Sequence, residues 1–377
     1  MKLKQLAILS TIVLFIVLST ASSSLVAMSP AADNRCSPGI PRDKHQQPFS
    51  CDSIWNMPIG ANAEYVPANI KPAGHISGDV DYYIVTTEAD PLVPWYNPDS
   101  WMKGRCSNTG KGRNDYLHVP KDLIVPDATE ETTPNNSAAF LQPDGKTLIQ
   151  MSPLARCKQG GAVFGYVSPS YPHYHENIYG QGITGGHAGS GLSSIGGTVR
   201  LGELVTDKPI RHALKLELYA NQYLYKQPPG FRWPAVRADI YAYNDYYNDG
   251  KMQYGGSNPA LVMGSLLAIP PEITEDALNL QTDPGRKLFF TLQNYGGYIV
   301  DDTLWDNHAI AIERGAMAEF ESKYQYSFDS DGGAWFDDVN KLFQALQIVD
   351  NNDRQNVGGG GKPRQHLTTA LSVAITD

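Results

Sequence analysis

The stretch RHALKLELYA, residues 211–220, carries the pattern on which the fold prediction depends. Its three leucines alternate with Lys215 and Glu217, so that every second side chain lies on the same side of an extended chain. This spacing has the period of a β-strand and not that of a helix. We therefore expect a strand here, with one apolar and one polar face.

Further strands are predicted on both sides of this stretch. In residues 138–156, AAFLQPDGKTLIQMSPLAR, the tight-turn sequence PDG joins two apolar runs and predicts a β-hairpin. Other short runs, rich in apolar and aromatic residues and bounded by turn residues, have the composition of strands. These runs are DYYIVTT (81–87), DLIVP (122–126), AVFGYVS (162–168), GTVRLGELV (197–205), YIVDDT (298–303) and LTTALSVAITD (367–377).

Two segments have helical features instead. In TDPGRKLFFTLQNYGG, residues 282–297, Asp283 is the expected N-cap, Pro284 suits the first helical position and Gly296 suits the residue after the helix. In AWFDDVNKLFQALQIV, residues 334–349, apolar residues recur at helical spacing. Both segments lie in the last third of the chain.

The balance of these elements predicts a β-rich α+β fold. Its body would be an antiparallel sheet or sandwich, with a few peripheral helices and long loops. No strong interdomain linker is evident in the sequence. Residues 33–377 are therefore expected to form a single elaborated domain.

Residues 1–30 have the features of a signal peptide. Lys2 and Lys4 precede the apolar run LAILSTIVLFIVLST, and the small residues of ASSSLVA follow it. Cleavage is expected roughly within residues 21–32. The alternative is an uncleaved membrane anchor, but the run is short for a full span of roughly 20 residues. We expect a secreted or extracytoplasmic protein that has no membrane association after cleavage.

The four cysteines, Cys36, Cys51, Cys106 and Cys157, favour disulfides in an exported chain because their number is even. Buried free thiols are the alternative, and the lack of a C-x-x-C pair argues against zinc. Three pairings are possible. We favour Cys36–Cys51 with Cys106–Cys157, because the first pair closes a short loop.

The charge of the chain excludes one class of partner. The net charge is −9, and no run rich in Lys and Arg is present. A nucleic-acid-binding protein would need such a basic patch. We expect no nucleic-acid partner.

The stretch YGQGITGGHAGSG, residues 179–191, contains glycines in the G-x-G-x-x-G spacing of dinucleotide-binding loops. That motif requires a strand before the glycines and a helix after them, whereas a polar segment precedes and more glycines follow. The frame of a nucleophilic serine, G-x-S-x-G, is also missing. The remaining readings are a plain connection across the end of a sheet and a binding loop that presents His187 to a ligand.

Titratable and aromatic side chains precede this loop. His173 and His175 would share one side of an extended segment and, with Glu176, resemble part of a metal site. No third ligand is fixed by spacing, so neither a metal nor another cofactor is expected. Tyr174 and His175 are instead predicted to contact substrate.

Arg211 and His212 stand at the head of the alternating strand. A histidine on a strand is commonly a hydrogen-bonded structural residue. It can also serve as an acid or base in the cleavage of a glycan. His212 is therefore a candidate catalytic residue, and Arg211 is a candidate for binding substrate.

Asp301 and Asp302 lie in the predicted strand YIVDDT. Adjacent residues of a strand point to opposite faces, so only one of them can face a cleft on one side. Glycoside hydrolysis needs a second carboxyl group. Its candidates are Glu176, Glu203 and Asp239. Alternatively, the two aspartates form an acidic turn that closes the strand.

The chain has 21 Tyr and 6 Trp, and many of them lie outside the predicted helices. Tyr and Trp combine an apolar face with a polar group and therefore suit sugar rings. Trp233 and Trp305 are expected to line a sugar-binding cleft. Plain packing or surface roles are the alternative.

The segments GGHAGSGLSSIGGT, IRHAL, RWPA and GRKLFFTLQNYGGYIVDD, in this order, resemble a group of exported bacterial proteins that is largely uncharacterised. The resemblance covers roughly residues 50–315 and implies no specific activity. It does imply that His187, Arg211, His212, Trp233 and the two aspartates belong to one unit.

We predict an extracellular carbohydrate-active protein, most simply an enzyme that degrades a polysaccharide or oligosaccharide. Asp301 or Asp302 would act with His187 or His212. A hydrolase would use two carboxyl groups, whereas a lyase would use a His or Tyr base and Arg211 to neutralise a uronate. The alternatives are a non-catalytic glycan-binding or cell-envelope protein, and a structural protein whose glycines serve only the fold.

Overall fold

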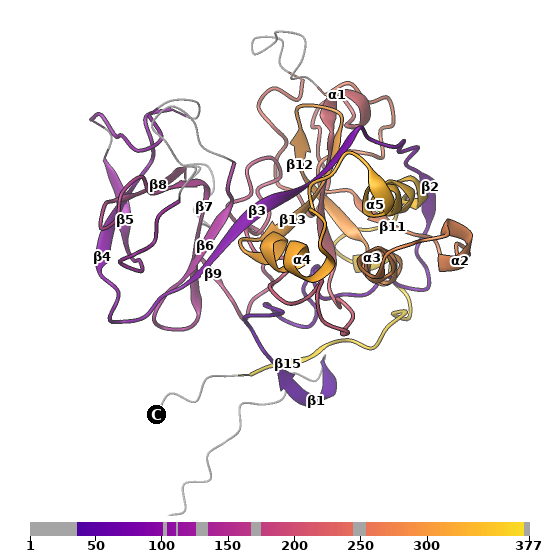
Figure 1. Cartoon of the computed structure of the whole chain (residues 1–377), viewed down its shortest axis with the longest axis horizontal. Helices are drawn as coiled ribbons and strands as arrows, with labels where there is room; N and C mark the ends of the chain where they lie inside the picture. Colours follow the sequence, from indigo (N-terminus) through magenta and orange to yellow (C-terminus); the bar gives the residue numbers. More distant parts are fainter. Residues whose placement is uncertain are drawn as a thin grey trace, which may run out of the picture. The chain divides into compact units, whose positions relative to one another are not determined.

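A large β-sheet with few helices beside it forms the body of the protein (Figure 1). The computed structural model describes residues 36–100, 104–110, 112–125, 135–166, 175–243 and 254–372. All of them belong to one unit that begins at Asn34. Strands predominate over helices, which confirms the predicted β-rich α+β fold. The predicted signal segment, residues 1–30, lies outside the described residues.

The structure contains a 13-stranded sheet and a two-stranded sheet. The large sheet has the strand order β2 (Tyr65–Pro67), β14 (Gln347–Val349), β11 (Leu266–Ala268), β12 (Gly297–Thr303), β10 (Leu214–Tyr219), β13 (Asn307–Glu313), β3 (His75–Val85), β6 (Ala138–Leu141), β7 (Thr147–Ala155), β8 (Val163–Tyr166), β4 (Leu92–Tyr96) and β5 (Arg113–His118). In addition, β9 (His175–Asn177) pairs with β7. The small sheet pairs β1 (Ser37–Arg42) with β15 (Thr369–Leu371).

The large sheet is mixed, whereas the sequence predicted an antiparallel body. β3 pairs in parallel with both β13 and β6, and β10 pairs in parallel with β12. Parallel neighbours need a long connection, and residues 220–296 separate β10 from β12. Alternation along one strand shows which side chains share a face. It carries no information about the direction of the neighbouring strand.

The helices cover one apolar face of this sheet. The three leucines of β10 belong to the same buried core as residues of α3 (Asp283–Asn294), α4 (Ala316–Tyr324) and α5 (Gly333–Ala345). Figure 1 shows α3 and α5 side by side, and the two helices are in contact. The short elements are α1 (Ala220–Tyr223), α2 (Glu275–Leu278) and the 3₁₀ turn η2 (Val357–Gly359).

Several predicted elements are present and others are not. The hairpin predicted for residues 138–156 is formed by β6 and β7, and the alternating stretch forms β10. Residues 122–125 and 197–205 form no strand, although Val199 makes an isolated bridge with Ile312. The N-cap of α3 is Thr282 and not Asp283, because the Thr282 side chain accepts a hydrogen bond from the N–H of Gly285.

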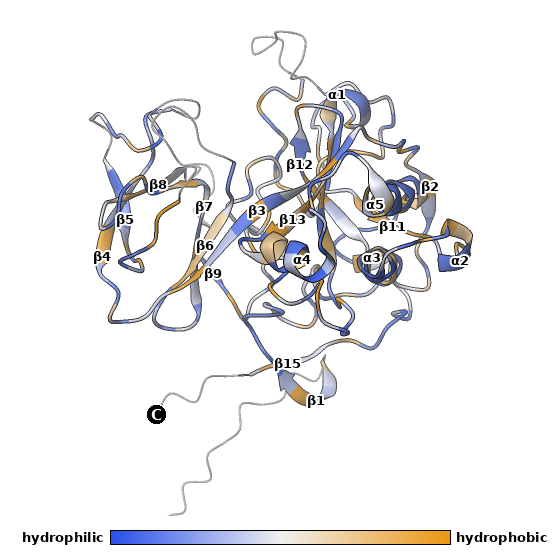
Figure 2. Ribbon diagram, viewed as in Figure 1, coloured by the Kyte–Doolittle hydropathy of each residue, from blue (hydrophilic) through white to orange (hydrophobic). Residues whose placement is uncertain are grey.

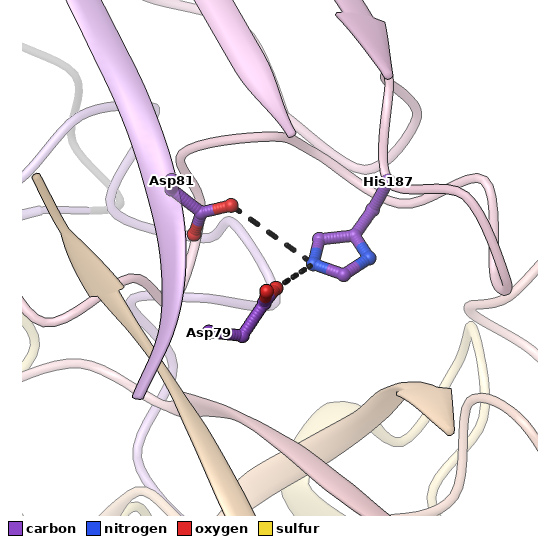
Figure 3. Close-up of side chains that lie close together, drawn as sticks. All are labelled: Asp79, Asp81 and His187. Atoms are coloured by element: carbon purple, nitrogen blue, oxygen red, sulfur yellow. Dashed lines mark ion pairs between the residues drawn. The ribbon is translucent and has the colours of Figure 1, made fainter. Parts of the chain in front are cut away.

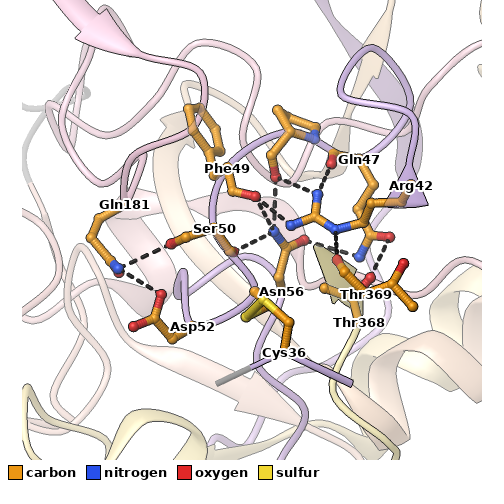
Figure 4. Close-up of a disulfide and its surroundings, with 12 residues drawn as sticks. Cys36, Arg42, Gln47, Phe49, Ser50, Asp52, Asn56, Gln181, Thr368 and Thr369 are labelled. Atoms are coloured by element: carbon orange, nitrogen blue, oxygen red, sulfur yellow. Dashed lines mark hydrogen bonds between the residues drawn. A yellow bond between two sulfur atoms is a disulfide. The ribbon is translucent and has the colours of Figure 1, made fainter. Parts of the chain in front are cut away.

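Both favoured disulfides are present, Cys36–Cys51 and Cys106–Cys157. The first fastens a loop near the small sheet (Figure 4). Inside that loop, the Arg42 guanidinium donates to the carbonyls of Gln47 and Phe49 and, across to β15, to the carbonyl of Thr369. Two disulfides are typical of a protein in an oxidising, extracellular environment.

The helices within the described ranges are all too short or too polar to cross a membrane.

Candidate functional site

The polar face of β10 is buried, and this places charged side chains inside the protein. Lys215 is 0% exposed and Glu217 is also buried. The backbone around residues 193–197 covers this face. The Lys215 ammonium donates to the carbonyl of Ser194, and the backbone N–H of Lys215 donates to the carbonyl of Gly197. Figure 2 shows hydrophilic residues within strands of the sheet, among them β3 and β12.

The pairing of four strands brings three acids onto this face. Glu217 of β10 lies opposite Asp301 of β12 on one side and opposite Ala309 of β13 on the other. Asp79 of β3 lies opposite Ala311 of β13. Paired residues of neighbouring strands project from the same face of a sheet. The two small alanines therefore leave room for acids from β10 and β3 to approach each other across β13.

A β-bulge in β12 sets the direction of the Asp301 side chain. Leu216 pairs with Ile299, but the next residue, Glu217, pairs with Asp301, so Val300 is the additional residue. Such a bulge shifts the following side chains relative to the partner strand. Asp301 thereby aligns with the polar face and Asp302 with Leu218 of the apolar face. The expectation that adjacent aspartates face different sides agrees with this register.

The glycine-rich loop lies against this bulge. The N–H of Ser190 donates to the carbonyl of Val300 at 3.0 Å. A Cβ on Gly189 would lie 2.6 Å from a carboxylate oxygen of Asp301, and one on Gly186 would lie 2.6 Å from the backbone nitrogen of Met151. Glycine therefore permits the close approach of the loop to β12 and β7. Residues 183–200 contain no helix, so the structure does not form a dinucleotide-binding loop.

This loop inserts His187 between the acids (Figure 3). The imidazole is 1% exposed, and its Nε2 lies 3.6 Å from Asp79 Oδ2 and 4.0 Å from Asp81 Oδ1. Its Nδ1 lies 3.3 Å from Asp301 Oδ2. The chain is further fixed by Arg237, which donates to the backbone carbonyl of His187. One imidazole thus links acids from β3 and β12.

Asp81 is held by a buried lysine. Its Oδ2 lies 2.6 Å from the Lys215 ammonium and accepts a hydrogen bond of 2.6 Å from the Thr198 hydroxyl. Its Oδ1 accepts no hydrogen bond from any described residue. One oxygen of this carboxylate is therefore satisfied and the other faces His187.

A second group of acids adjoins Asp301. Single carboxylate oxygens of Asp239, Asp301 and Asp302 lie within 4.8 Å of one another. Tyr241 donates to Asp302 at 2.6 Å, and Tyr254 donates to Asp239 at 2.7 Å. We call these three residues together with Asp79, Asp81 and Glu217 the acidic cluster.

Burial and mutual repulsion keep protons on part of the acidic cluster. Burial, followed by the charges of Asp79 and Asp301, raises the pKa of Glu217 well above its usual value. Burial and the charge of Asp301 raise the pKa of Asp239 to about 7. Burial and the charge of Asp239 raise the pKa of Asp302 as well. Acids this close together in a buried site cannot all ionise.

For Asp79 and His187, the neighbouring groups outweigh the effect of burial on the pKa. Burial alone would raise the pKa of Asp79, but the nearby His187 and Glu217 and the charge of Lys215 lower it. Burial and Lys215 act to lower the pKa of His187, but its contacts with Asp301 and Asp79 outweigh them and raise it to about 9. When no cation is bound at the cluster, His187 is therefore protonated and positively charged at neutral pH.

The acidic cluster reaches the surface at three side chains. Asp79 is 21% exposed, and Asp239 and Asp302 are half-buried. The other members are buried. The cluster therefore borders the solvent at these three residues.

The structure brings together only part of the predicted site. Asp301 and Asp302 belong to the acidic cluster, together with Asp239 from the list of possible carboxyl partners, and His187 lies beside Asp301. His212 is occupied elsewhere: its Nε2 lies 3.0 Å from Glu203 Oε2, and its Nδ1 lies 2.8 Å from the carbonyl of Ala213. These two bonds give His212 a structural role at the start of β10.

The predicted substrate-binding residues are dispersed. The exposed Arg211 lies beside Tyr295. Trp233 lines a pocket of about 510 Å³ with Asp52, Gln181, Arg354 and Asn356. Trp305, which is 58% exposed, follows β12, and His175 is exposed in β9. Tyr174 lies outside the described residues.

Sequence reasoning missed Asp79, Asp81, Lys215 and Glu217. The available signals were the sequence Asp-Val-Asp at positions 79–81, just before an apolar strand, and the charged face of β10. A strand with an apolar face and a charged face is normally half exposed. Only the covering glycine-rich loop shows that the charged face of β10 is buried.

No protein-family model, curated protein or solved structure matches the chain. The resemblance to exported bacterial proteins stays a prediction, and the function is inferred below from the chemistry of the site.

Proposed function

We propose that the protein is an extracytoplasmic enzyme that hydrolyses glycosidic bonds of a polysaccharide at the acidic cluster. The observation that carries this proposal is that Asp301 adjoins both His187 and the pair Asp239 and Asp302, with Asp79, Asp239 and Asp302 partly exposed. Glycoside hydrolysis uses two carboxyl groups, one as an acid and one as a base or nucleophile. Asp79, Asp239 and Asp302 are the members of the cluster that are partly exposed.

The separation of the acids favours one stereochemical course. The three carboxylate oxygens of Asp239, Asp301 and Asp302 lie within 4.8 Å of one another. Carboxyl groups are about 5–5.5 Å apart in retaining enzymes and about 6.5–9.5 Å apart in inverting enzymes, which must admit a water molecule between them. The spacing here is closer to the first value, so we expect retention of configuration.

Hydrolysis is favoured over elimination by the placement of the positive groups. A lyase acting on a uronate needs a cation that neutralises the substrate carboxylate, together with a base. Lys215 is buried and bonded to Asp81, and Arg211 lies beside Tyr295. His212 has both ring nitrogens engaged. The predicted lyase residues thus have other partners.

The pocket at Trp233 supplies a surface suited to sugar. It combines an indole with amide, carboxylate and guanidinium groups from Gln181, Asp52 and Arg354. An aromatic face with a few polar groups is the usual composition of a carbohydrate subsite. Gln181 precedes His187 by six residues, and Trp233 precedes Asp239 by six residues. The same two chain segments therefore contribute to the pocket and to the acidic cluster.

Secretion is part of this proposal. It is supported by the two disulfides and by the signal-like composition of residues 1–30. A non-catalytic glycan-binding protein is the alternative, and the pocket at Trp233 is the observation that favours it. Binding at that pocket would need no acid.

The test is a product assay on a panel of neutral and acidic polysaccharides. New reducing ends without ultraviolet absorbance, and a first product of retained anomeric configuration by NMR, are expected. Unsaturated products that absorb in the ultraviolet would show a lyase instead. Binding without any product, abolished by Trp233→Ala but not by Asp302→Asn, would show a binding protein and refute hydrolysis.

A further inference from the structure

We propose that Asp79, Asp81 and His187 bind a divalent transition-metal ion of the zinc type. Single ligand atoms from these three residues lie within 4.8 Å of one another. The two carboxylates come from one strand, β3, and the imidazole comes from the glycine-rich loop (Figure 3). A mixed set of carboxylate oxygens and one imidazole nitrogen suits zinc or manganese better than calcium, which prefers oxygen ligands alone.

The first support is the absence of hydrogen bonds at buried atoms that point into this site. Nε2 of His187 forms no hydrogen bond with a described residue, although the side chain is 1% exposed. The same is true of Asp81 Oδ1, whose side chain is also 1% exposed. Buried polar atoms are normally satisfied, and unsatisfied ones indicate a missing partner such as an ion. Here His187 Nε2 and Asp81 Oδ1 face each other.

The second support is the distance between the ligand atoms. Nε2 of His187 lies 3.6 Å from Asp79 Oδ2 and 4.0 Å from Asp81 Oδ1. Zinc–nitrogen and zinc–oxygen bonds of about 2.0–2.2 Å at tetrahedral angles place ligand atoms about 3.4 Å apart. The observed separations are too long for direct hydrogen bonds. Both distances from Nε2 are thus only a few tenths of an ångström longer than a tetrahedral site requires.

The third support is the orientation of the imidazole. Nδ1 of His187 lies 3.3 Å from Asp301 Oδ2, on the side of the ring away from Asp79. Histidines that bind metals usually present their other ring nitrogen to a carboxylate or carbonyl, which fixes the ring and its tautomer. Asp301 is placed to do this. Lys215 has the corresponding effect on Asp81, since it holds Oδ2 and leaves Oδ1 directed at the site.

The local charge also favours a cation. The groups that face the site are the carboxyl groups of Asp79, Asp81, Glu217 and Asp301, and the cation Lys215. Of these acids, Asp79, Asp81 and Asp301 alone outnumber the fixed cation. A divalent ion would lower the repulsion among them.

The other group of acids is a weaker candidate. Oxygens of Asp239 and Asp302 already accept hydrogen bonds from Tyr254 and Tyr241, and an oxygen of Asp301 accepts one from the N–H of Asp302. That group also lacks an imidazole. The 21% exposure of Asp79 leaves the proposed site accessible to an ion from solvent.

The proposal is tested by calorimetric titration of the folded protein after treatment with a chelator. ZnCl₂ and MnCl₂ are titrated in parallel with CaCl₂ and MgCl₂. We expect one equivalent of Zn²⁺ or Mn²⁺ per chain, with much weaker binding of Ca²⁺ and Mg²⁺. Asp79→Asn and His187→Gln should each weaken binding at least about tenfold. The metal should also raise the Tm of the wild-type protein, because it binds only the folded state.

The control is His366→Ala, which removes an exposed histidine far along the chain and should leave the titration unchanged. Circular dichroism checks folding, and if His187→Gln does not fold, Asp79→Asn decides the result. Absence of binding, tighter binding of Ca²⁺ than of Zn²⁺ or Mn²⁺, or unchanged titration in Asp79→Asn would overturn the proposal. Metal binding is read without a substrate, so this result is independent of the proposed hydrolysis.

Discussion

At the scale of single residues, two alanines of β13 decide whether the acids can approach one another. Ala309 faces Glu217 and Ala311 faces Asp79, and both alanines are buried. A larger side chain at either position would occupy the space between the strands that carry the acids. The neighbouring Ile310 and Ile312 pack into the apolar core instead.

Ala311→Leu should therefore lower both stability and activity. Overpacking a buried position costs about 1–3 kcal/mol, and the added side chain would push Asp79 away from His187. The measurement is urea unfolding together with reducing-end release. Ile310→Val is the matched control on the opposite face. It should lose about 0.5–1.5 kcal/mol with little change in activity per folded molecule. Equal loss of activity in both variants would contradict this explanation.

His212 gives a pH-dependent contribution to stability. Burial lowers its pKa, but the charge and hydrogen bond of Glu203 outweigh burial and raise the pKa above the usual 6.5. A raised pKa in the folded state means that the contribution is complete below about pH 6.5 and is lost as pH rises through the folded-state value. Arg200 is the nearby cation that opposes the shift.

We therefore expect the free energy of unfolding of the wild type to exceed that of Glu203→Gln by a margin that shrinks as pH rises above neutrality. Urea unfolding between pH 5 and pH 9 measures this difference. A margin that stays constant over this range, or grows with pH, would show that His212 is not charged in the folded protein.

At the scale of elements, the start of α3 is tied to α5. The Thr282 hydroxyl accepts from the N–H of Gly285 and donates to Asp338 of α5 at 2.7 Å. The same Asp338 carboxylate accepts from the backbone N–H groups of Gln281 and Thr282. One carboxylate thus accepts hydrogen bonds from the backbone just before α3 and links α3 to α5.

Thr282→Ala should lower the free energy of unfolding by about 1–2 kcal/mol, because it removes an N-cap and leaves Asp338 with one partner fewer. The control is Thr274→Ala at the start of α2. Thr274 caps a four-residue helix with no buried residues, so its loss should have a smaller effect. Chemical denaturation measures both variants. A larger loss for Thr274→Ala would contradict this assignment.

The elements show how far sequence reasoning reaches. β10, the β6–β7 hairpin and α3 follow from local periodicity and turn residues, because their patterns repeat within a few residues. Residues 197–205 have the composition of a strand but form none, and the carbonyl of Gly197 accepts from the backbone N–H of Lys215 in β10. Local sequence does not report such a role, since it depends on hydrogen bonds to distant segments.

The candidate site also shows that local sequence does not report contacts between distant segments. His187, Asp301 and Asp302 were found because they stand in unusual local sequences, whereas Glu217 and Asp79 occupy ordinary strand positions. Their proximity depends on strand order and on the bulge at Val300. His212 was chosen for its chemistry, but its partner Glu203 could not be recognised from spacing.

At the scale of the whole molecule, the two disulfides tie distant parts of the chain. Cys36–Cys51 spans 15 residues and Cys106–Cys157 spans 51. The chain-entropy model gives about 3 kcal/mol for the shorter loop and about 4 kcal/mol for the longer one. The longer bridge lies in the part of the sheet formed by β4, β5, β7 and β8.

Replacing both cysteines of one pair by serine should therefore destabilise the protein more for Cys106 and Cys157 than for Cys36 and Cys51. Urea unfolding of the two double variants under non-reducing conditions makes the comparison. Wild-type stability after loss of either pair would indicate that the bridges contribute little to the folded state.

The central claim is that the acidic cluster around His187 is the catalytic site. The most direct measurement is kcat/KM for reducing-end release by Asp302→Asn, compared with Asp331→Asn, which alters an exposed aspartate before α5. We expect a loss of at least about 100-fold for Asp302→Asn, as for removal of a general acid or base, and wild-type activity for Asp331→Asn. Full activity in a folded Asp302→Asn variant would contradict the claim.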